Sequence, residues 1–421
     1  MLTQMTHRLC PLLLVFVLLG CSQGRLSAPP MTTTASAVLT SGSDVVADRL
    51  ATPTQVPTQL PSTHDTLPLE STTIAQGRER VVAIGKMAVA RASHSATLLP
   101  DGRVLIAGGC TRAGCEMGDD GATAELYDPS KGAFTPTGRM TTERVGHTAT
   151  LLSTGKVLIV GGFDRDGVLA GAELYDPATS TFTTTGSMSV PRAGYSATML
   201  PSGKVLIVGG FDGSHRLTSA ELYDPGTGTF TTTGGMATPR AEHATAPLAD
   251  GRILVTGGSS GGKDVLASAE IYDPKAGTFG RTGDMMAVRY KHAATTLRDG
   301  KVLIVGGSDA RDGLGRYAST EIYDPVAGSF QRGPPMAAPR YKLSGAVALL
   351  TTGEVLVGGG DERVEVYAAA IGSFRTTEGS VGAGLAFTTA TLLADGRVVI
   401  VGGYDERINP ITSAWVYDPL G

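Results

Sequence analysis

One short phrase repeats seven times after residue 100: a glycine-containing turn, a β-branched run, a Gly-Gly pair and a segment close to Glu-Leu-Tyr-Asp-Pro. The glycine pairs stand at Gly108/Gly109, Gly161/Gly162, Gly209/Gly210, Gly257/Gly258, Gly306/Gly307, Gly358/Gly359 and Gly402/Gly403. A spacing of roughly 50 residues suits repeats that each form a small sheet, and it is too long for helical solenoid repeats. The period therefore predicts an array of repeated β units.

The second repeat indicates what one unit folds into. Residues 146–152 alternate small with larger side chains and predict an inner strand, and the apolar run 157–160 predicts a strand buried on both faces. Two further strands are predicted at 172–175 and 182–185, separated by Pro177, which stops the ladder. Four antiparallel strands per repeat predict one blade of a β-propeller, so the chain is predicted to be an all-β, seven-bladed ring.

These elements resemble the kelch-repeat β-propeller, a fold also used by the central domain of galactose oxidase. The resemblance covers nearly all of residues 80–421, because the Gly-Gly pair and the third-strand Tyr recur in every repeat. The fourth strand departs from it by carrying Phe where many kelch repeats carry Trp, at Phe134, Phe182, Phe230, Phe279, Phe330 and Phe374. The resemblance implies that partners bind at the starts of the inner strands and in the loops after the Gly-Gly pairs.

The two ends of the repeat region complement each other. The last repeat stops at Tyr417-Asp418-Pro419 and lacks a fourth strand, whereas residues 80–87 look like a fourth strand followed by Gly-x-Met. We therefore predict that the N-terminal strand completes blade seven and closes the ring.

The first 21 residues have the features of an export signal. Arg8 supplies the positive charge, and residues 12–19 form an apolar stretch too short to span a bilayer. The sequence then ends in Leu18-Leu19-Gly20-Cys21, which resembles a bacterial lipoprotein signal, although Leu19 is unusual at its position. The resemblance implies a lipidated Cys21, and Ser22 after it implies sorting to the outer membrane. An ordinary secretory signal with an incidental Cys is the alternative.

Residues 22–76 are rich in Ser, Thr, Pro and Ala and show no apolar period. Such a composition cannot build a core, so we predict a disordered tether ahead of the propeller of residues 77–421. A coil of this length spans on the order of 40 Å. We expect a monomer in the cell envelope that contacts the membrane through its lipid only, facing either the periplasm or the cell surface.

Charge and cysteine content narrow the possible partners. The net charge of −4 argues against nucleic acid, which requires a basic face. Cys10 would leave with the signal, so Cys110 and Cys115 remain close together in one loop. An oxidising compartment favours a disulfide between them. Half of a metal site is the alternative, but two further ligands nearby are missing.

Polar residues recur at fixed distances before each turn glycine. Eleven residues before it stand Arg91, Arg144, Arg192, Arg240, Arg289, Lys342 and Leu385. Eight residues before it stand His94, His147, Tyr195, His243, His292, Gly345 and Thr388. The third strands carry Glu125, Glu173, Glu221, Glu270, Glu321, Glu365 and Trp415.

The last repeat loses both charges, Leu385 going with Trp415. A structural Arg–Glu pair predicts this, because a lone buried charge is costly. The functional alternative is that the five arginines from Arg91 to Arg289, with His94, His147, Tyr195, His243 and His292, surround one mouth of the central channel and bind an anionic ligand. Opposite blades of such a channel lie too far apart for these histidines to share a metal ion.

The loops after the Gly-Gly pairs differ in length and charge while the frame stays constant, which is typical of a binding surface. An Asp recurs in them at Asp164, Asp212, Asp309, Asp361 and Asp405. A turn-capping side chain explains this Asp more simply than a calcium ligand does.

The sequence predicts no catalytic residue. The sequence holds no Gly-x-Ser-x-Gly motif, no phosphate loop and no recognisable copper site around Cys110. We therefore predict an envelope-anchored, non-catalytic propeller without a metal or cofactor that binds a protein or a glycan. The alternative is a carbohydrate-active enzyme on the same frame, either a sugar oxidase or a mutarotase.

Overall fold

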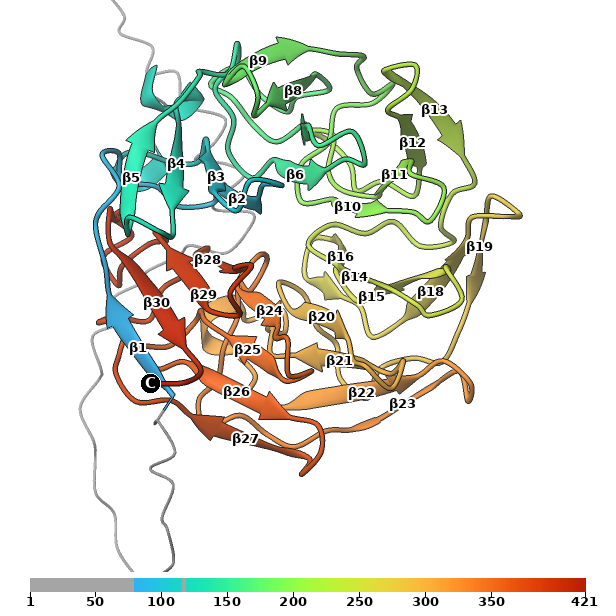
Figure 1. Ribbon diagram of the computed structural model, residues 1–421. Coiled ribbons are helices and arrows are strands. Elements are labelled where there is room, and N and C mark those ends of the chain that lie inside the picture. Colours follow the sequence, from blue (N-terminus) through green and yellow to red (C-terminus); the bar gives the residue numbers. More distant parts are fainter. Residues whose placement is uncertain (1–78, 116–118) are drawn as a thin grey trace, which may run out of the picture. The chain divides into compact units, whose positions relative to one another are not determined.

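The computed structural model describes residues 79–115 and 119–421 (Figure 1). These residues belong to one compact unit, in which seven four-stranded antiparallel sheets are arranged as the blades of a propeller. The predicted signal segment with Cys21 and the predicted tether lie outside the described residues. Their boundaries at 21 and 76 stay predictions.

Blades one to six each take four strands in chain order, from the inner strand to the outer one. Blades one to three are β2–β5 (Ser95–Leu98, Val104–Ala107, Ala124–Asp128, Ala133–Pro136), β6–β9 (Thr148–Leu151, Val157–Val160, Ala172–Asp176, Thr181–Thr184) and β10–β13 (Ser196–Met199, Val205–Val208, Ala220–Asp224, Thr229–Thr233). Blades four to six are β14, β15, β18 and β19 (Ala244–Pro247, Ile253–Thr256, Ala269–Asp273, Thr278–Arg281), β20–β23 (Ala293–Thr296, Val302–Val305, Thr320–Asp324, Ser329–Arg332) and β24–β27 (Val347–Leu349, Val355–Val357, Glu365–Ala368, Ser373–Thr376).

Blade seven joins the two ends of the propeller, as predicted. Its first three strands are β28 (Thr389–Leu392), β29 (Val398–Val401) and β30 (Ala414–Asp418), and its outer strand is β1 (Arg80–Ala83). β1 runs antiparallel to β30, with Arg80 opposite Asp418 and Val81 opposite Tyr417. The inner strands then contact one another in a complete cycle, because β28 touches both β24 and β2.

The apolar residues of the second strands form the cores between neighbouring blades. Leu158 and Val160 on β7 are fully buried and pack with Val205 and Ile207 on β11 of the next blade. The same arrangement recurs around the ring, so each blade buries its faces only against its neighbours. The continuous β-branched run is buried on both faces, as the sequence predicted.

The recurring Tyr and Phe meet across the outer half of each blade. Tyr175 on β8 lies directly opposite Phe182 on β9, and their ring centroids are 4.8 Å apart. Equivalent pairs occur in blades one to six. The Tyr175 hydroxyl also lies 2.8 Å from Thr137 Oγ1 of blade one, which ties neighbouring blades together at their outer edge.

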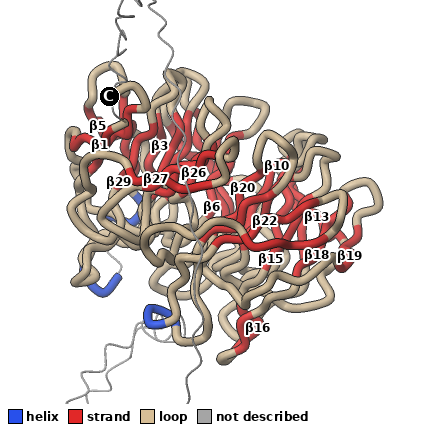
Figure 2. The backbone as a smooth tube through the Cα atoms, turned by 90° about the horizontal axis from the view of Figure 1, so that it is seen from below, coloured by secondary structure: helices blue, strands red, loops and turns tan. Residues whose placement is uncertain are grey.

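The loops after the second strands carry the remaining short elements. They are the 3-10 helices η1 (Ala113–Cys115), η2 (Asp119–Ala122) and η3 (Asp312–Leu314) and the hairpin of β16 (Ser259–Gly261) and β17 (Asp264–Val265). Figure 2 shows helical turns and β16 on the same side of the propeller. None of the helices within 79–115 and 119–421 has the length and hydropathy needed to cross a bilayer.

Candidate functional site

The arginines of the predicted binding mouth are buried inside the blades. Arg240 is fully buried; its Nη1 donates to Gly257 O (2.9 Å) and its Nη2 to Glu270 Oε1 (3.0 Å). The other carboxylate oxygen, Glu270 Oε2, accepts a hydrogen bond from Ala237 N (2.8 Å). Burial lowers the pKa of the Arg240 guanidinium, with Glu270 acting in the opposite direction. This arginine therefore joins a loop, a glycine pair and a third strand within one blade.

The same contacts hold the other arginines of the row. They pair with the third-strand glutamates as Arg91–Glu125, Arg144–Glu173, Arg192–Glu221 and Arg289–Glu321. All of these arginines are at most 2% exposed. The structure thus confirms the Arg–Glu pair. It removes the arginines from the candidate mouth, because they are buried and their terminal guanidinium nitrogens already donate hydrogen bonds inside the protein.

The backbone of the arginine row links each blade to the one before it. In each link the second glycine of a pair donates its N–H to the carbonyl of the next blade's row residue, as Gly258 N does to Arg289 O at 2.8 Å. The link recurs at all seven blade boundaries, including Gly403 N to Arg91 O (2.8 Å) and Gly360 N to Leu385 O (2.7 Å). We call the buried Arg–Glu pair together with this link the latch.

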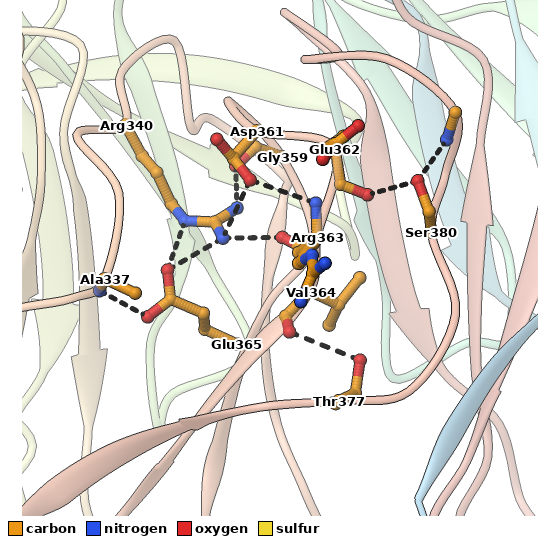
Figure 3. A network of polar contacts seen from close by, with 11 residues as sticks. Ala337, Arg340, Gly359, Asp361, Glu362, Arg363, Val364, Glu365, Thr377 and Ser380 are labelled. Atoms are coloured by element: carbon orange, nitrogen blue, oxygen red, sulfur yellow. Dashed lines mark hydrogen bonds and ion pairs between the residues drawn. The ribbon is translucent and has the colours of Figure 1, made fainter.

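Blade six corrects the sequence alignment by two residues. Arg340, not Lys342, is its latch arginine: it is fully buried, donates to Gly359 O (2.8 Å) and pairs with Glu365 Oε1 (2.8 Å) (Figure 3). The glycine pair that makes these contacts in blade six is therefore Gly359/Gly360. Leu343, not Gly345, holds the position of the histidine row, because it lies against Gly306 as His243 lies against Gly209. Two extra residues before β24 had shifted the count.

Blade seven replaces the charged pair with apolar side chains. Leu385 is fully buried and Trp415 is 7% exposed. Both pack in one cluster with Val364, Leu356 and Ile400, which spans blades six and seven. The boundary therefore stays closed without an ion pair, while the glycine-to-carbonyl link of the latch is retained.

The histidine row ties the inner strands of neighbouring blades. His147 Nε2 lies 2.9 Å from Ser95 Oγ of blade one, and His243 Nε2 lies 2.9 Å from Ser196 Oγ of blade three. His94 makes the equivalent contact with Thr389 of blade seven, and His292 contacts Thr256 on the second strand of blade four. In the same row, Tyr195 OH donates to Val160 O (2.5 Å). The polar group of each of these rings is therefore hydrogen-bonded to the preceding blade.

Burial keeps these histidines neutral. It lowers the pKa of His94, His147, His243 and His292 to about 3, and the nearby latch arginine adds to the effect. A positively charged imidazole would have no carboxylate partner at this position. The row therefore acts as a set of uncharged hydrogen-bonding groups, which does not favour an anionic ligand.

A cavity of about 460 Å³ lies at the starts of the inner strands, within the size range of small-molecule sites. Its wall includes small and hydroxyl-bearing residues of the inner strands, such as Ser95, Thr148 and Ala197. Its edge is formed by one residue from each blade, two positions after the latch row. We call these the rim residues: Ser93, Gly146, Gly194, Glu242, Lys291, Lys342 and Phe387.

Every rim residue adopts a left-handed backbone conformation, with φ between 52° and 62°. Backbone hydrogen bonds join several neighbouring rim residues, as in Glu242 N to Gly194 O (2.7 Å) and Lys291 N to Glu242 O (2.9 Å). Glycine adopts this conformation without cost, but other residues do so at an expense of roughly 1–2 kcal/mol. Sequence reasoning missed the rim; glycines at two of its seven positions were the available signal.

The rim residues of blades one to three have small side chains, and those of blades four to seven have large ones. We call these two parts the open half and the crowded half of the rim. Blades one to three contribute only Ser93, Gly146 and Gly194, whereas blades four to seven contribute Glu242, two lysines and Phe387. The Glu242 carboxylate reaches toward blade three: a Cβ atom added to Gly194 would lie 2.9 Å from Glu242 Oε1. The open half gives a ligand room to enter, and the crowded half offers it charged and aromatic groups.

The lysines of the crowded half are held by neighbouring groups. Lys291 Nζ donates to Asp312 Oδ1 (2.7 Å), which also accepts a hydrogen bond from Tyr290 OH (2.5 Å). Burial and the hydrogen bond to Asp312 raise the pKa of Tyr290. Lys342 Nζ lies 4.9 Å from the Tyr341 ring centroid and 5.3 Å from that of Phe387. These contacts fix the positions of both ammonium groups beside the cavity.

The recurring loop aspartates cap their own turns. Asp164 Oδ1 accepts hydrogen bonds from Asp166 N (2.8 Å) and Gly167 N (3.0 Å). Asp212, Asp309, Asp361 and Asp405 accept equivalent backbone bonds two residues ahead. Within the described residues, no group of three or more His, Cys, Asp or Glu side chains is placed to hold a metal ion.

Cys110 and Cys115 are joined in a disulfide, and both are buried. They pack with Ala92, Val145 and Tyr404 under the loop of blade one. Cys110 also exchanges both backbone hydrogen bonds with Ala92. The bridge therefore supports the blade-one loop beside the mouth and is not part of a metal site.

Comparisons with known proteins agree with this architecture. Residues 191–237, 240–286 and 289–337, which correspond to blades three to five, match the family model described as the kelch motif. The solved structure titled "Structure of YjhT" is 12% identical, with a TM-score of 0.52 over 79% of this chain and 96% of that chain. At this identity the likeness concerns the fold alone. No curated protein matches the chain. The chain is thus a seven-bladed β-propeller with kelch motifs in blades three to five.

Proposed function

We propose that this propeller is a binding module of the cell envelope whose ligand is a glycan held at the channel mouth. The observation that carries the proposal is the contrast between the latch and the rim. Six blades share one buried Arg–Glu pair, while the rim residues two positions later differ in size and charge and line a 460 Å³ cavity. A constant frame with a variable edge is how a scaffold presents a binding site.

The lining of the cavity favours a glycan over a folded protein partner. Hydroxyl groups, one carboxylate, two lysines and the rings of Phe163 and Phe387 surround a space sized for a small molecule. Aromatic rings with a few placed polar groups suit a sugar, which has both apolar faces and hydroxyls. A protein could contact the same face only through a short projecting segment.

Envelope anchoring is part of the proposal and rests on the sequence of residues 1–21. If Cys21 is lipidated, wild-type cells fed labelled palmitate will incorporate it into this chain, and the Cys21→Ser variant will not. Label retained in that variant would contradict the anchor.

The functional test is capture of a ligand by the full-length chain. We expect specific signals on a glycan array, and we expect their loss when the rim variant Glu242→Gln is used in place of wild type. A pulldown from envelope extract runs in parallel. A protein retained there, with an array that stays blank, would overturn the glycan and favour a protein partner.

An enzymatic role on sugars is the second candidate. It is favoured by the placement of the Glu242 carboxylate and the Lys291 ammonium on the same cavity, where they could act as acid and base. Exchange between sugar anomers, followed by NMR, would test for a mutarotase. Exchange no faster than the uncatalysed rate would contradict it.

A further inference from the structure

Among the residues that the structure describes, Glu242 is the one carboxylate on the lining of the cavity. It is half-buried, and within residues 79–115 and 119–421 its carboxylate oxygens make no hydrogen bond or ion pair. Its negative charge acts to raise the pKa of Arg216 in the blade-three loop and the pKa of Tyr290 in blade five. A carboxylate without a donor at the wall of a cavity is positioned to accept hydrogen bonds from a ligand.

The backbone at Glu242 gives an independent indication. Its φ of 56° is left-handed, although blades two and three show that glycine serves at the same rim position. Strain of this kind is concentrated at functional sites, where a side chain is held in place for a purpose other than stability. The carboxylate is thus placed over the open half of the mouth at the expense of local stability.

Phe387 supplies an aromatic surface on the same cavity. It also has a left-handed backbone (φ 55°), and its ring packs edge-on to Tyr404 with centroids 6.3 Å apart. The Nζ of Lys342 also lies 5.3 Å from the centroid of the Phe387 ring. The ring is therefore fixed in orientation, as a stacking platform for a ligand must be.

We propose that the mouth binds a neutral pyranose sugar, with two adjacent hydroxyls donating to the Glu242 carboxylate and one apolar face of the ring against Phe387. This proposal rests on the proposed function and specifies its ligand class. A carboxylate has two acceptor oxygens and matches a vicinal diol. The negative charge of Glu242 offsets the positive charge of Lys342, and Lys291 is paired with Asp312, so the lining does not favour an anionic sugar. The latch arginines, which would have attracted an anion, are buried.

The experiment measures binding of neutral monosaccharides and their deoxy analogues to the full-length chain by saturation-transfer NMR and calorimetry. We expect at least one neutral pyranose to bind, and removal of one hydroxyl of its diol to weaken binding by about tenfold or more. Glu242→Gln should weaken it to a similar extent. Phe387→Leu should weaken it too, and Phe387→Tyr should restore it.

Glu242→Gly separates a binding role from a structural one. It should abolish sugar binding while leaving the thermal midpoint unchanged or higher, because it relieves the left-handed backbone. Glu143→Gln is the matched control, since Glu143 pairs with Arg165 outside the cavity lining. Binding should be unchanged in that control.

Two results would overturn this inference and leave the proposed function standing. One is a neutral sugar that binds Glu242→Gly as tightly as wild type. The other is a glycan array that captures only acidic glycans. A failure of the proposed function itself looks different, because neither the array nor the sugars would then give any signal with wild-type protein.

Discussion

In each blade a nearly constant position, the latch arginine, stands two positions before a variable one, the rim residue. Arg240 is fully buried and has counterparts in five other blades, whereas Glu242 borders the cavity and has no counterpart with the same charge on the rim. The latch position is fixed by its partners, because a buried guanidinium requires a carboxylate and carbonyls around it. The rim position is fixed only in its backbone, so its side chain is free to serve a ligand. One loop thus carries both a residue that is required by its buried partners and a residue whose side chain can vary.

The largest effect should follow from breaking one latch on one side. Arg240→Leu leaves the Glu270 carboxylate buried without its partner, which should cost about 3–5 kcal/mol of unfolding free energy. Chemical denaturation of the variant and of wild type would measure it. A loss below about 1 kcal/mol would show that the latch is not structural.

Blade seven offers a way to repair that damage. Combining Arg240→Leu with Glu270→Trp recreates the Leu385 and Trp415 arrangement, and it should recover about 2 kcal/mol of the loss, since no lone charge remains. The recovery is incomplete because a transplanted Trp overpacks a site shaped for Glu. A double variant less stable than Arg240→Leu alone would mean that blade seven depends on neighbours absent from blade four.

The histidine row should make the propeller sensitive to acid. The folded pKa of His147 is about 3, below the unfolded value near 6.5, so the unfolded chain binds more protons between these values. Unfolding free energy should therefore be complete above pH 6.5 and fall as pH decreases toward 3, by about 1.4 kcal/mol per pH unit for each such histidine.

The variant His147→Tyr tests this, because Tyr195 occupies the same position in blade three. Between pH 7 and 4 the unfolding free energy of wild type should fall more steeply with decreasing pH than that of His147→Tyr. The reverse change, Tyr195→His, should steepen the dependence. Parallel curves for all three proteins would show that the row does not govern acid unfolding.

The smallest effect on stability should come from the rim. Glu242→Gly is expected to leave unfolding free energy within about 1 kcal/mol of wild type, because relief of the left-handed backbone offsets the added freedom of the unfolded chain. Thermal denaturation would detect a larger change. A loss comparable to that of Arg240→Leu would erase the distinction between latch and rim.

The sequence was sufficient for features that repeat along the chain. The Gly-Gly pairs and the strand pattern predicted the blades, and the unmatched ends predicted that β1 pairs with β30. The joint absence of Arg and Glu from the last repeat predicted the Arg–Glu pair, but not the backbone link of the latch. Such features can be compared between repeats, so each repeat tests the others.

Features whose side chains or spacing do not repeat could not be predicted from the sequence. Blade six was misaligned because two extra residues before β24 moved the turn glycine away from Arg340. The rim was missed because its members share a backbone angle and no side chain, and an angle is not visible in a list of residues. The division of the mouth into an open and a crowded half follows from these same residues and emerged only from the structure.

The pairing of β1 with β30 also sets an order of events in time. Arg80 lies opposite Asp418, so among the described strands the first one in the chain, β1, pairs with the last one, β30. Each of blades one to six can form its sheet once its own four strands have been synthesised. In blade seven the outer strand β1 is synthesised early and stays unpaired until β30 has been synthesised. Until then the outer edge that β30 will offer does not exist, and the ring stays open between its first and last blades. The propeller therefore closes only after β30 has been synthesised and has paired with β1.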